Sequence, residues 1–411
     1  MIASAAAPRP RLSKWPSVIL LSCCVVLAMS PWFAASAVVP ALRVQYRLSE
    51  SAVALMTSVV SLGFIAGTLA IALTGIADRQ DPRRVFRWCA SGGGAASLAA
   101  LAFDPGSATV IAMRFLGGAC MAGIYPLGMK IASGWTERDM GLLVGIITAS
   151  VTLGSASPYL IAALGDVGWP QASLAVACAS LASAFAIGWV ELGPRHTLNQ
   201  RFVVRQAFAA FRAGSLRLAN LGYFGHKWEN YAMWAWIGAF LQSSLATVPG
   251  VDDAKHVGNL AAFCVIAFGA VGCLVGGMAA DRIGRTTVAI AALALSGACC
   301  IAAGLLYAGH PAPLIALCLV WGFAVVADSR QFSSCVIELS DPSLTGTFLT
   351  VQTCIGFLIT LPAIHVVGYL SGRFGWHYAF SVLAVGPLLG IVAMVRLRGH
   401  PDAIELGHGR R

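Results

Sequence analysis

Long apolar runs alternate with short polar segments along most of this chain. A membrane-spanning helix needs about 20 mostly apolar residues. Twelve runs are long enough, at 17–42, 52–76, 84–103, 107–131, 140–164, 169–191, 218–243, 257–280, 287–308, 312–336, 347–369 and 376–396. The first run is too long for the apolar core of a signal peptide, so we interpret it as a membrane helix. The pattern predicts an all-α membrane protein with twelve transmembrane helices.

One connection is much longer than the others and divides the chain almost in half. It reads GPRHTLNQRFVVRQAFAAFRAGSLR and separates the sixth apolar run from the seventh. We therefore predict an N-terminal half at 1–194, a cytoplasmic basic linker at 195–217 and a C-terminal half at 218–411. The linker is expected to lie along the membrane surface as a connector without a ligand.

The composition agrees with a protein that lies in a membrane. Of the 411 residues, 58% are hydrophobic and 11% are charged, whereas about a quarter of a soluble domain is charged. Nearly all of the 12 cysteines fall within apolar runs, and no CxxC pair occurs. We interpret them as small apolar side chains. We expect no metal site and no cofactor.

The basic residues fall mostly on one side of the predicted topology. With a cytoplasmic N-terminus, that side carries 20 Lys and Arg residues, the far side carries 4 and the spans carry 3. Positive charge favours the cytoplasmic face of a membrane. The net charge of +10 is thus explained without a nucleic-acid partner. We expect a multi-pass protein of the bacterial inner (plasma) membrane with both termini in the cytoplasm.

Two loops on the basic side repeat the same pattern. TGIADRQDPRRV follows the second run and GGMAADRIGRTTV follows the eighth, which places Asp78 and Asp281 203 residues apart. The pair Gly-Trp precedes the sixth and the twelfth runs, at positions 207 residues apart. These echoes indicate that the two six-span halves arose by duplication.

At these loops the whole chain resembles the major facilitator superfamily, whose signature is close to Gly-x-Leu-Ala-Asp-Arg-x-Gly-Arg-Arg. The first copy departs from it, because Thr74 replaces the first glycine and Asp81-Pro82 replaces a later one. The resemblance implies two six-helix bundles with internal inverted repeats, and a conformational gate in these loops. The gate residues would be Asp78, Arg79, Arg83, Asp281, Arg282 and Arg285. The alternative is that these charges only anchor the loops on the positive side.

The fourth run, MRFLGGACMAG, is similar to the family's Arg-x-x-x-Gly motif through Arg114 and Gly118. Gly117 and Gly118 are expected to let backbones approach closely. On a continuous helix, Tyr125 lies eleven residues after Arg114 and on the same face. In proton-coupled members the equivalent arginine is often tied to coupling. The fifth run lacks the Gly-Pro signature of many drug antiporters, which disfavours multidrug efflux.

The seventh run carries an unusual set of polar residues. Ionisable groups in the membrane are costly and usually face a cavity. Helical spacing places five residues of this run on the same face of the helix, namely Tyr223, His226, Lys227, Asn230 and Trp234. Glu229 could reach His226 at i,i+3. We interpret this face as the lining of a water-filled cavity; the alternative is a hydrogen bond between helices that is only structural.

The tenth run carries the second deep acid. Trp321 and Asp328 lie seven residues apart and share a helix face, while Arg330 points away and is interpreted as reaching for the cytoplasmic surface. We expect Glu229 or Asp328 to carry a coupling proton, with Arg114 or His226 as modulator. The candidate substrate and coupling residues are Arg114, Tyr125, His226, Lys227, Glu229, Asn230, Trp234, Trp321 and Asp328.

These features predict a secondary active transporter that works by alternating access and is coupled to protons. No Walker motif is visible, so ATP is not the expected energy source. Three deep cations against two deep acids favour a small organic anion. An uncoupled facilitator or uniporter and a drug or metabolite efflux antiporter remain as alternatives. An enzyme is disfavoured because the sequence has no catalytic cluster. The expected partners are the substrate, protons and the bilayer, and the protein is expected to be a monomer.

Overall fold

The computed structural model describes residues 13–136, 140–165, 167–194, 206, 209–341 and 344–410. These residues form helices joined by short turns. The α-helices are α1 Lys14–Met29, α2 Ala34–Ala37, α3 Val39–Gln45, α4 Glu50–Thr74, α5 Ile76–Arg79, α6 Pro82–Ala99, α7 Ala108–Met121, α8 Tyr125–Ser133, α9 Met140–Ala163, α10 Trp169–Ala186, α11 Gly214–Leu245, α12 Ala254–Ile283, α13 Arg285–Leu306, α14 Pro311–Ala327, α15 Ser329–Leu339, α16 Thr345–Phe374, α17 Trp376–Ala379 and α18 Val385–Arg398. Short 3₁₀ segments include η2 Ile187–Trp189 and η6 Pro401–Gly409. Most of the predicted linker, at 195–205 and 207–208, lies outside the described residues.

Nine helical segments in the described part of the chain are long and apolar enough to cross a membrane. They coincide with nine of the twelve predicted runs. The other three runs, at 17–42, 84–103 and 218–243, are also helical but do not meet that standard. The helix of the first run stops at Met29 after 16 residues. The helix of the third run, α6, begins with several arginines, and α11, the helix of the seventh run, carries the polar residues described in the sequence analysis.

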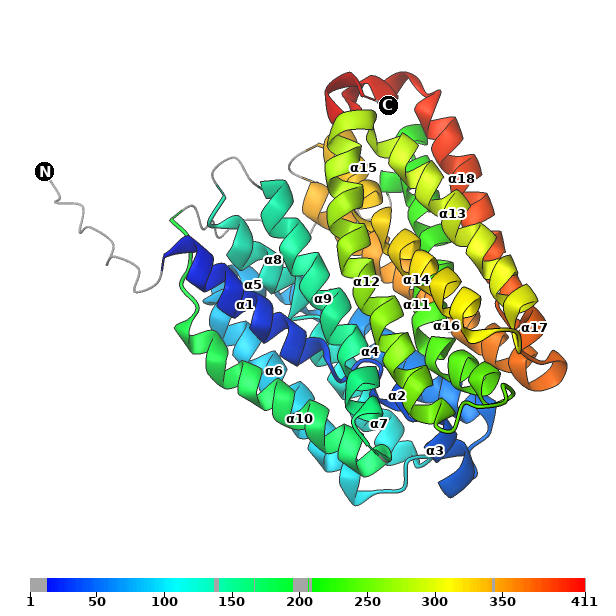
Figure 1. The fold of residues 1–411 in the computed structure, drawn as a ribbon. Helices are drawn as coiled ribbons and strands as arrows, with labels where there is room; N and C mark the ends of the chain where they lie inside the picture. The colour runs from blue at the N-terminus through cyan, green and yellow to red at the C-terminus, as the bar shows by residue number, and fades with distance from the viewer. Residues whose placement is uncertain are drawn as a thin grey trace, which may run out of the picture.

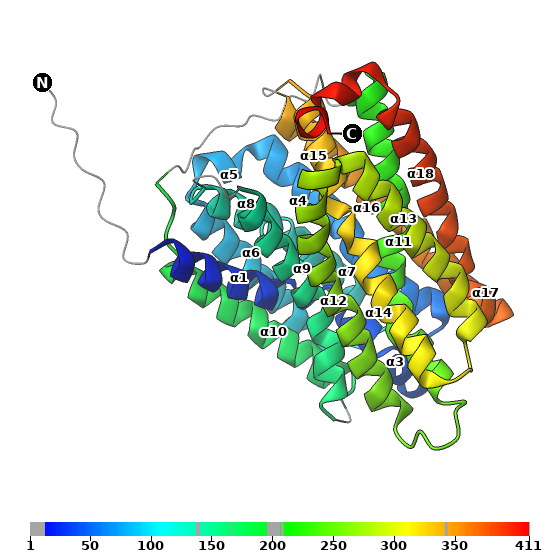
Figure 2. The same ribbon diagram turned by 45° about the horizontal axis from the view of Figure 1, so that its top comes forward.

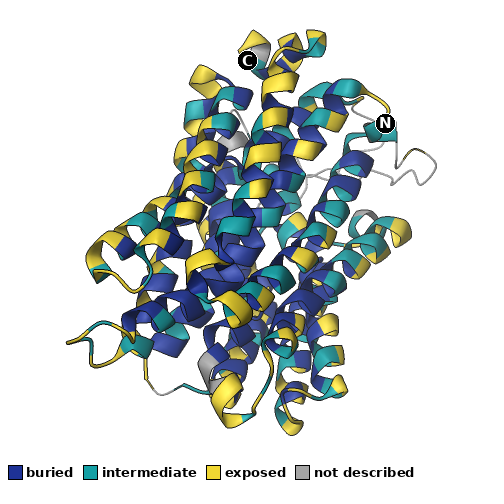
Figure 3. Ribbon diagram, turned by 90° about the vertical axis from the view of Figure 1, so that its right-hand side faces the viewer, coloured by how far each residue is buried: buried dark blue, intermediate teal, exposed yellow. Residues whose placement is uncertain are grey.

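Figures 1 and 2 show the helices of the first half, coloured blue to green, gathered beside those of the second half, coloured green to red. The halves meet where α4 contacts α16 and where α9 contacts α12. The loops with Arg83 and Arg285 lie at one end, here called the basic end, and the turn before α17 lies at the opposite end. Buried residues concentrate between the helices, and many exposed ones line the outer faces (Figure 3). Exposed outward side chains such as Leu305 are apolar, as a lipid-facing surface requires.

Several of the predicted continuous helices are broken. The first run turns at residues 30–33 between α1 and α2, the fourth turns at 122–124 between α7 and α8, the tenth breaks at Asp328 between α14 and α15, and the twelfth turns at Phe380 between α17 and the 3₁₀ segment η5 Ser381–Ala384. Tyr125 therefore begins a new helix, so the spacing that placed it on one face with Arg114 does not hold. The fourth and tenth runs occupy equivalent places in the two halves, and broken helices commonly form transporter binding sites.

Glycines set the close approach of α4 and α7. A Cβ atom built on Gly118 would overlap the carbonyl oxygen of Val60, and one on Gly63 would overlap that of Phe115. Contact at this distance is possible only without a side chain. Gly117 behaves differently, because a Cβ there would meet nothing within 4 Å. The prediction of close packing is thus confirmed for Gly118 and wrong for Gly117.

Gly118→Ala is expected to destabilise the protein by about 1–3 kcal/mol, because the added methyl group must push α7 away from α4. The matched control is the neighbouring Gly117→Ala. It is expected to be neutral or stabilising, since alanine favours a helix over glycine by about 1 kcal/mol. Thermal unfolding of the purified variants measures both. Equal stability of the two variants would contradict this account of the α4–α7 contact.

Candidate substrate and coupling site

The polar residues of α11 are buried in the interior of the protein. The exposed fraction of the whole residue is 0% for His226, 7% for Lys227, 1% for Glu229 and 3% for Asn230. Their side chains contact different neighbours, so α11 supplies several distinct polar contacts. The water-filled cavity that the helical spacing suggests stays a prediction.

Glu229 is held by donors from two neighbouring helices. Trp321 Nε1 donates to its Oε1 at 2.7 Å and Ser296 Oγ donates to its Oε2 at 2.9 Å. Cys300 Sγ donates to Oε1 at 3.2 Å. The expected contact between Glu229 and His226 is not among its hydrogen bonds. Sequence reasoning missed Ser296 and Cys300, which lie in an ordinary apolar run and become partners only when α13 packs against α11.

His226 pairs instead with Asp328. The His226 Nδ1 and Asp328 Oδ1 atoms are 2.8 Å apart, and both side chains are 1% exposed. Asn230 Nδ2 lies 3.4 Å from the other ring nitrogen of His226. Because Asp328 occupies the break between α14 and α15, this pair links α11 to a point where the backbone changes direction.

Among the described residues, Lys227 has aromatic neighbours and no acid in direct contact, although Asp328 is near enough to interact with it electrostatically. Its Nζ lies 4.5 Å from the ring centre of Tyr231, 4.8 Å from that of Phe357 and 5.4 Å from that of Tyr223. Ring faces attract a cation by their electron density. Within the described part of the chain, Lys227 has neither a hydrogen bond nor an ion pair. Its charge therefore has no opposite charge in direct contact.

The rings around Lys227 belong to a cluster that joins the two halves. Trp32 lies between the end of α1 and the start of α2, and its ring centre is 5.3 Å from that of Tyr231 and 5.4 Å from that of Phe357. Phe64 of α4 lies 4.6 Å from Phe357 of α16. Trp234 follows on α11, 5.5 Å from Tyr231. We call these five residues, together with Phe33, the aromatic cluster.

Each of the three guanidinium nitrogens of Arg114 donates to a backbone carbonyl. Its Nε donates to the carbonyl of Met56 at 2.9 Å, and its two terminal nitrogens donate to those of Pro31 and Trp32 at 3.1 and 2.9 Å. The last two carbonyls belong to the turn that follows α1, where helical hydrogen bonds are lost. Arg114 also lines a small pocket with Gly117, Trp169 and other residues of the first half. Sequence reasoning did not anticipate this bridging role.

Tyr125 and Arg330 lie where the two halves face each other. Tyr125 begins α8, which packs against α9 of the same half. A Cβ built on Gly277 of α12 would lie 2.7 Å from Arg330 Nη1, and one on Gly145 of α9 would lie 3.1 Å from it. The Arg330 guanidinium is thus packed against glycines of both halves, whereas we expected it to extend to the membrane surface.

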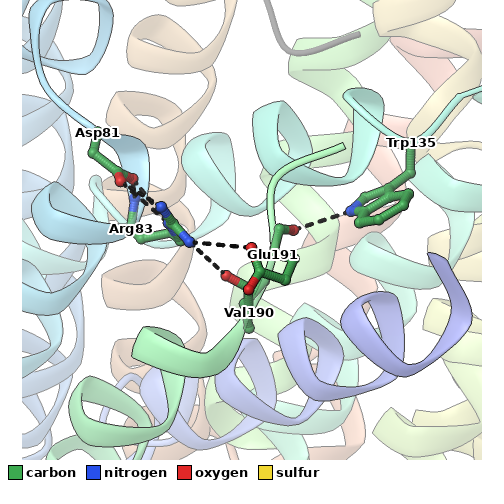
Figure 4. Close-up of polar contacts among 5 residues, drawn as sticks. All are labelled: Asp81, Arg83, Trp135, Val190 and Glu191. Atoms are coloured by element: carbon green, nitrogen blue, oxygen red, sulfur yellow. Dashed lines mark hydrogen bonds and ion pairs between the residues drawn. The ribbon is translucent and has the colours of Figure 1, made fainter. Parts of the chain in front are cut away.

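The first loop of the repeat contains a small charge network (Figure 4). Asp81 caps the start of α6 by accepting from the backbone N–H of Arg83 at 2.9 Å. The Arg83 guanidinium binds the Asp81 carboxylate at 2.7 Å and donates to the carbonyl of Val190 at 3.0 Å. Glu191 lies 3.8 Å from it. Asp81 and Pro82, where the sequence departs from the family signature, therefore form the start of α6, with the proline in its first turn.

The second loop uses different partners. Arg285 Nη2 lies 2.7 Å from Glu338 at the end of α15, and Asp281 is 3.6 Å from the same guanidinium. Glu338 also accepts from the backbone N–H of Gly407 in η6. Arg79 and Arg282 are exposed, and the side chain of Asp78 lies outside the described residues. Of the predicted gate residues, Arg83 and Arg285 thus have carboxylate partners on the neighbouring chain segments.

Arg83→Gln is expected to lower stability by up to about 1 kcal/mol, a small loss because the Asp81–Arg83 pair is partly exposed. Although partial burial raises it, the hydrogen bonds and charge of Arg83 bring the pKa of Asp81 below its usual value. This contribution is present at neutral pH and disappears as the pH falls through that lowered pKa. Unfolding of wild type and variant should therefore converge in acid. A stability difference that persists unchanged in strong acid would contradict the assignment.

Buried charged side chains beside the meeting surface of two membrane-embedded halves define a membrane transport protein. The sequence profile of the Major Facilitator Superfamily matches residues 21–361, and the chain belongs to this family of transporters. It is accordingly a multi-pass membrane protein and not an enzyme.

Solved structures and one curated relative agree with this assignment. A variant of the nucleoside transporter NupG superposes with a TM-score of 0.71 at 15% identity, covering 94% of this chain and 100% of that one. The D-xylose-proton symporter gives 0.71 at 14% identity, covering 96% and 99%. Dipeptide and tripeptide permease A of Edwardsiella piscicida is 26% identical over 184 residues. That match covers 42% of this chain and 35% of the permease.

Proposed function

We propose that this protein is a secondary active transporter that moves a small organic anion through the bacterial inner membrane together with protons. Two six-helix bundles, at 1–194 and 218–411, make twelve spans with both termini in the cytoplasm. The linker at 195–217 joins them along the cytoplasmic surface. The bundles rock against each other so that the central site opens to each side in turn. The 20 to 4 distribution of basic residues supports this orientation.

The contacts between the halves support the assignment of this structure to one conformation of the transport cycle. Side-chain hydrogen bonds across the interface, among the described residues, join Ser58 to His365, Ser61 to Thr360, Tyr159 to the carbonyl of Trp234, His256 to the carbonyl of Ala163 and Asn259 to the carbonyl of Ala162. All of them lie between the middle of the protein and its opposite end. The conformation is accordingly one that is closed at the opposite end and opens by separation at the basic end. Arg83 and Arg285 brace the loops at that end and act in the gate.

The preference for an anion rests on one observation, the unpaired charge of Lys227. Both deep acids are already engaged, Glu229 by three donors and Asp328 by His226. A negative substrate would supply the missing counter-charge in a low-dielectric site. The carboxylate of a dipeptide would serve as well as that of a metabolite, so the peptide-permease relative is compatible with this proposal.

Proton coupling is assigned to Asp328 with His226 as its modulator. Asp328 sits at a helix break and has one titratable partner, whereas every oxygen of Glu229 accepts a hydrogen bond. A pair of this kind can bind a proton in one conformation and release it in the other. The precedent in the fold is the xylose symporter, whose name states that it is coupled to protons.

Flux into proteoliposomes tests the proposal. A panel of radiolabelled organic anions, a dipeptide, a nucleoside and xylose is offered with and without an inward proton gradient. Accumulation of an anion above its external concentration, only with the gradient, is the expected result. Equilibration that ignores the gradient would make the protein a facilitator. Transport of the neutral compounds alone would remove the anion assignment.

A further inference from the structure

Three donors from buried residues in and beside the aromatic cluster have no hydrogen-bond acceptor among the residues that the structure describes. They are the ammonium of Lys227 and the indole N–H groups of Trp32 and Trp234, in residues that are 7%, 1% and 2% exposed. Neither indole nitrogen has a hydrogen-bond partner among the described residues. Trp32 comes from the first half of the chain and Lys227 and Trp234 from the second. Both halves of the chain therefore contribute an unpaired donor to the region of the aromatic cluster.

Such an arrangement is unusual in a folded protein. Buried donors are nearly always paired, and leaving one unpaired destabilises the structure. Trp321, by contrast, uses its indole N–H to bind Glu229. Two unpaired indoles and one unpaired ammonium therefore point to a ligand that brings acceptor atoms and a negative charge. A carboxylate provides both, because its two oxygens accept several hydrogen bonds.

The surroundings of these donors favour a flat apolar body on that ligand. Neighbouring rings of the cluster have centres 4.6 to 6.4 Å apart, within the range in which aromatic rings attract one another. Trp32 packs against Tyr231 and Phe357, and these two rings in turn lie beside the ammonium of Lys227. A ring that enters as the halves separate would replace ring-to-ring contacts between the halves with contacts to itself. A sugar would instead require many polar side chains.

We infer that the transported anion is an aromatic monocarboxylate that binds between the halves at the aromatic cluster. Its carboxylate pairs with Lys227 and accepts from the indoles of Trp32 and Trp234, and its ring stacks among Trp32, Tyr231 and Phe357. One charge is expected on the ligand because Lys227 is the cation at these rings, whereas Arg330 is packed against α9 and α12. The inference deepens the proposed function and rests on it for the step of transport, but binding is measurable separately.

Equilibrium binding of radiolabelled benzoate to the purified protein in detergent is the test. Competition with unlabelled benzoate, benzamide and acetate separates the charge from the ring. Benzamide and acetate are each expected to compete at least about tenfold more weakly, because one lacks the charge and the other the ring. Competition by terephthalate that is stronger than by benzoate would overturn the assignment of a single charge.

Variants locate the site. Lys227→Gln is expected to weaken benzoate binding by about tenfold or more, and Trp32→Phe or Trp234→Phe by about threefold to tenfold, because each removes one donor and keeps its ring or stem. Lys255→Gln, on the far side of the topology, is the matched control and should bind as wild type does. Thermal unfolding of each variant identifies any that is not folded. Folded Lys227→Gln that binds benzoate normally would overturn the proposal.

Binding and flux are measured separately, so a failure of the aromatic ligand can be distinguished from a failure of the proposed transport function. Wild type that binds no aromatic carboxylate yet accumulates another compound with a proton gradient would overturn the aromatic ligand and leave the transporter assignment intact. Lys227-dependent binding of benzoate without flux in proteoliposomes would support the site and contradict coupled transport.

Discussion

Replacing Asp328 by Asn is expected to abolish proton-driven accumulation of substrate while leaving its exchange across the membrane intact. Asn keeps the size of the side chain beside His226, but it cannot bind and release a proton at neutral pH. We expect accumulation in proteoliposomes with a proton gradient to fall by at least about tenfold, since gradient-driven uptake needs a group that titrates in the cycle. Exchange of labelled for unlabelled substrate, measured without a gradient, should stay within a few-fold of wild type.

Glu229→Gln is the matched control for this experiment. Like Asp328→Asn, it removes the charge of a buried acid. The acid in this case is on α11 and accepts hydrogen bonds from Trp321, Ser296 and Cys300. We expect less folded protein, because an amide nitrogen would replace one acceptor, and normal coupling in the fraction that folds. Coupled uptake that is lost in Glu229→Gln and kept in Asp328→Asn would reverse the assignment of the two acids.

Arg114→Met is expected to destabilise the protein by about 3 kcal/mol or more. The variant leaves the carbonyls of Pro31, Trp32 and Met56 without their donor, and hydrogen bonds to a charged group contribute about 1.5–3 kcal/mol each. In a membrane no water replaces the missing donor. Thermal unfolding in detergent and the yield of folded protein measure the loss. Arg114→Lys should recover only part of it, because an ammonium lacks the planar fork that reaches three acceptors.

The exposed Arg282→Gln provides a baseline for removing a cation, and it is expected to unfold like wild type. If Arg114→Met is as stable as this control but does not transport, Arg114 has the role expected from the sequence, in substrate binding or coupling. A stable variant with full transport would show that the three backbone contacts are dispensable.

Much of the architecture could be predicted from the chain itself. Nine of the predicted spans coincide with helices able to cross a membrane, because about 20 consecutive apolar residues have few other stable environments. The paired loops at Asp78 and Asp281 pointed to the family that the profile match establishes. Arg114, Lys227, Glu229 and Asp328 were identified as deep charges for a related reason, since a charged residue stands out in an apolar run.

The partners of those charges were not predictable in the same way. Helical spacing suggested that Glu229 reaches His226, yet the acid binds Ser296, Cys300 and Trp321. Those residues lie 67 to 92 positions away along the chain, and no local pattern marks them. The break at Asp328 was missed for a similar reason: the apolar pattern continues through it, so the spacing of the run predicted one straight helix.

The sequence by itself determined that this protein is a membrane-embedded, helical transporter of the Major Facilitator Superfamily, because hydropathy and short motifs depend on residues near one another in the chain. Only the tertiary structure decided which charges neutralise each other and which do not. Arg114 was left to bind backbone at a helix break, Asp328 was paired with His226, and Lys227 was left among aromatic rings. Those outcomes depend on how helices from distant parts of the chain pack, which the order of residues along one helix does not specify.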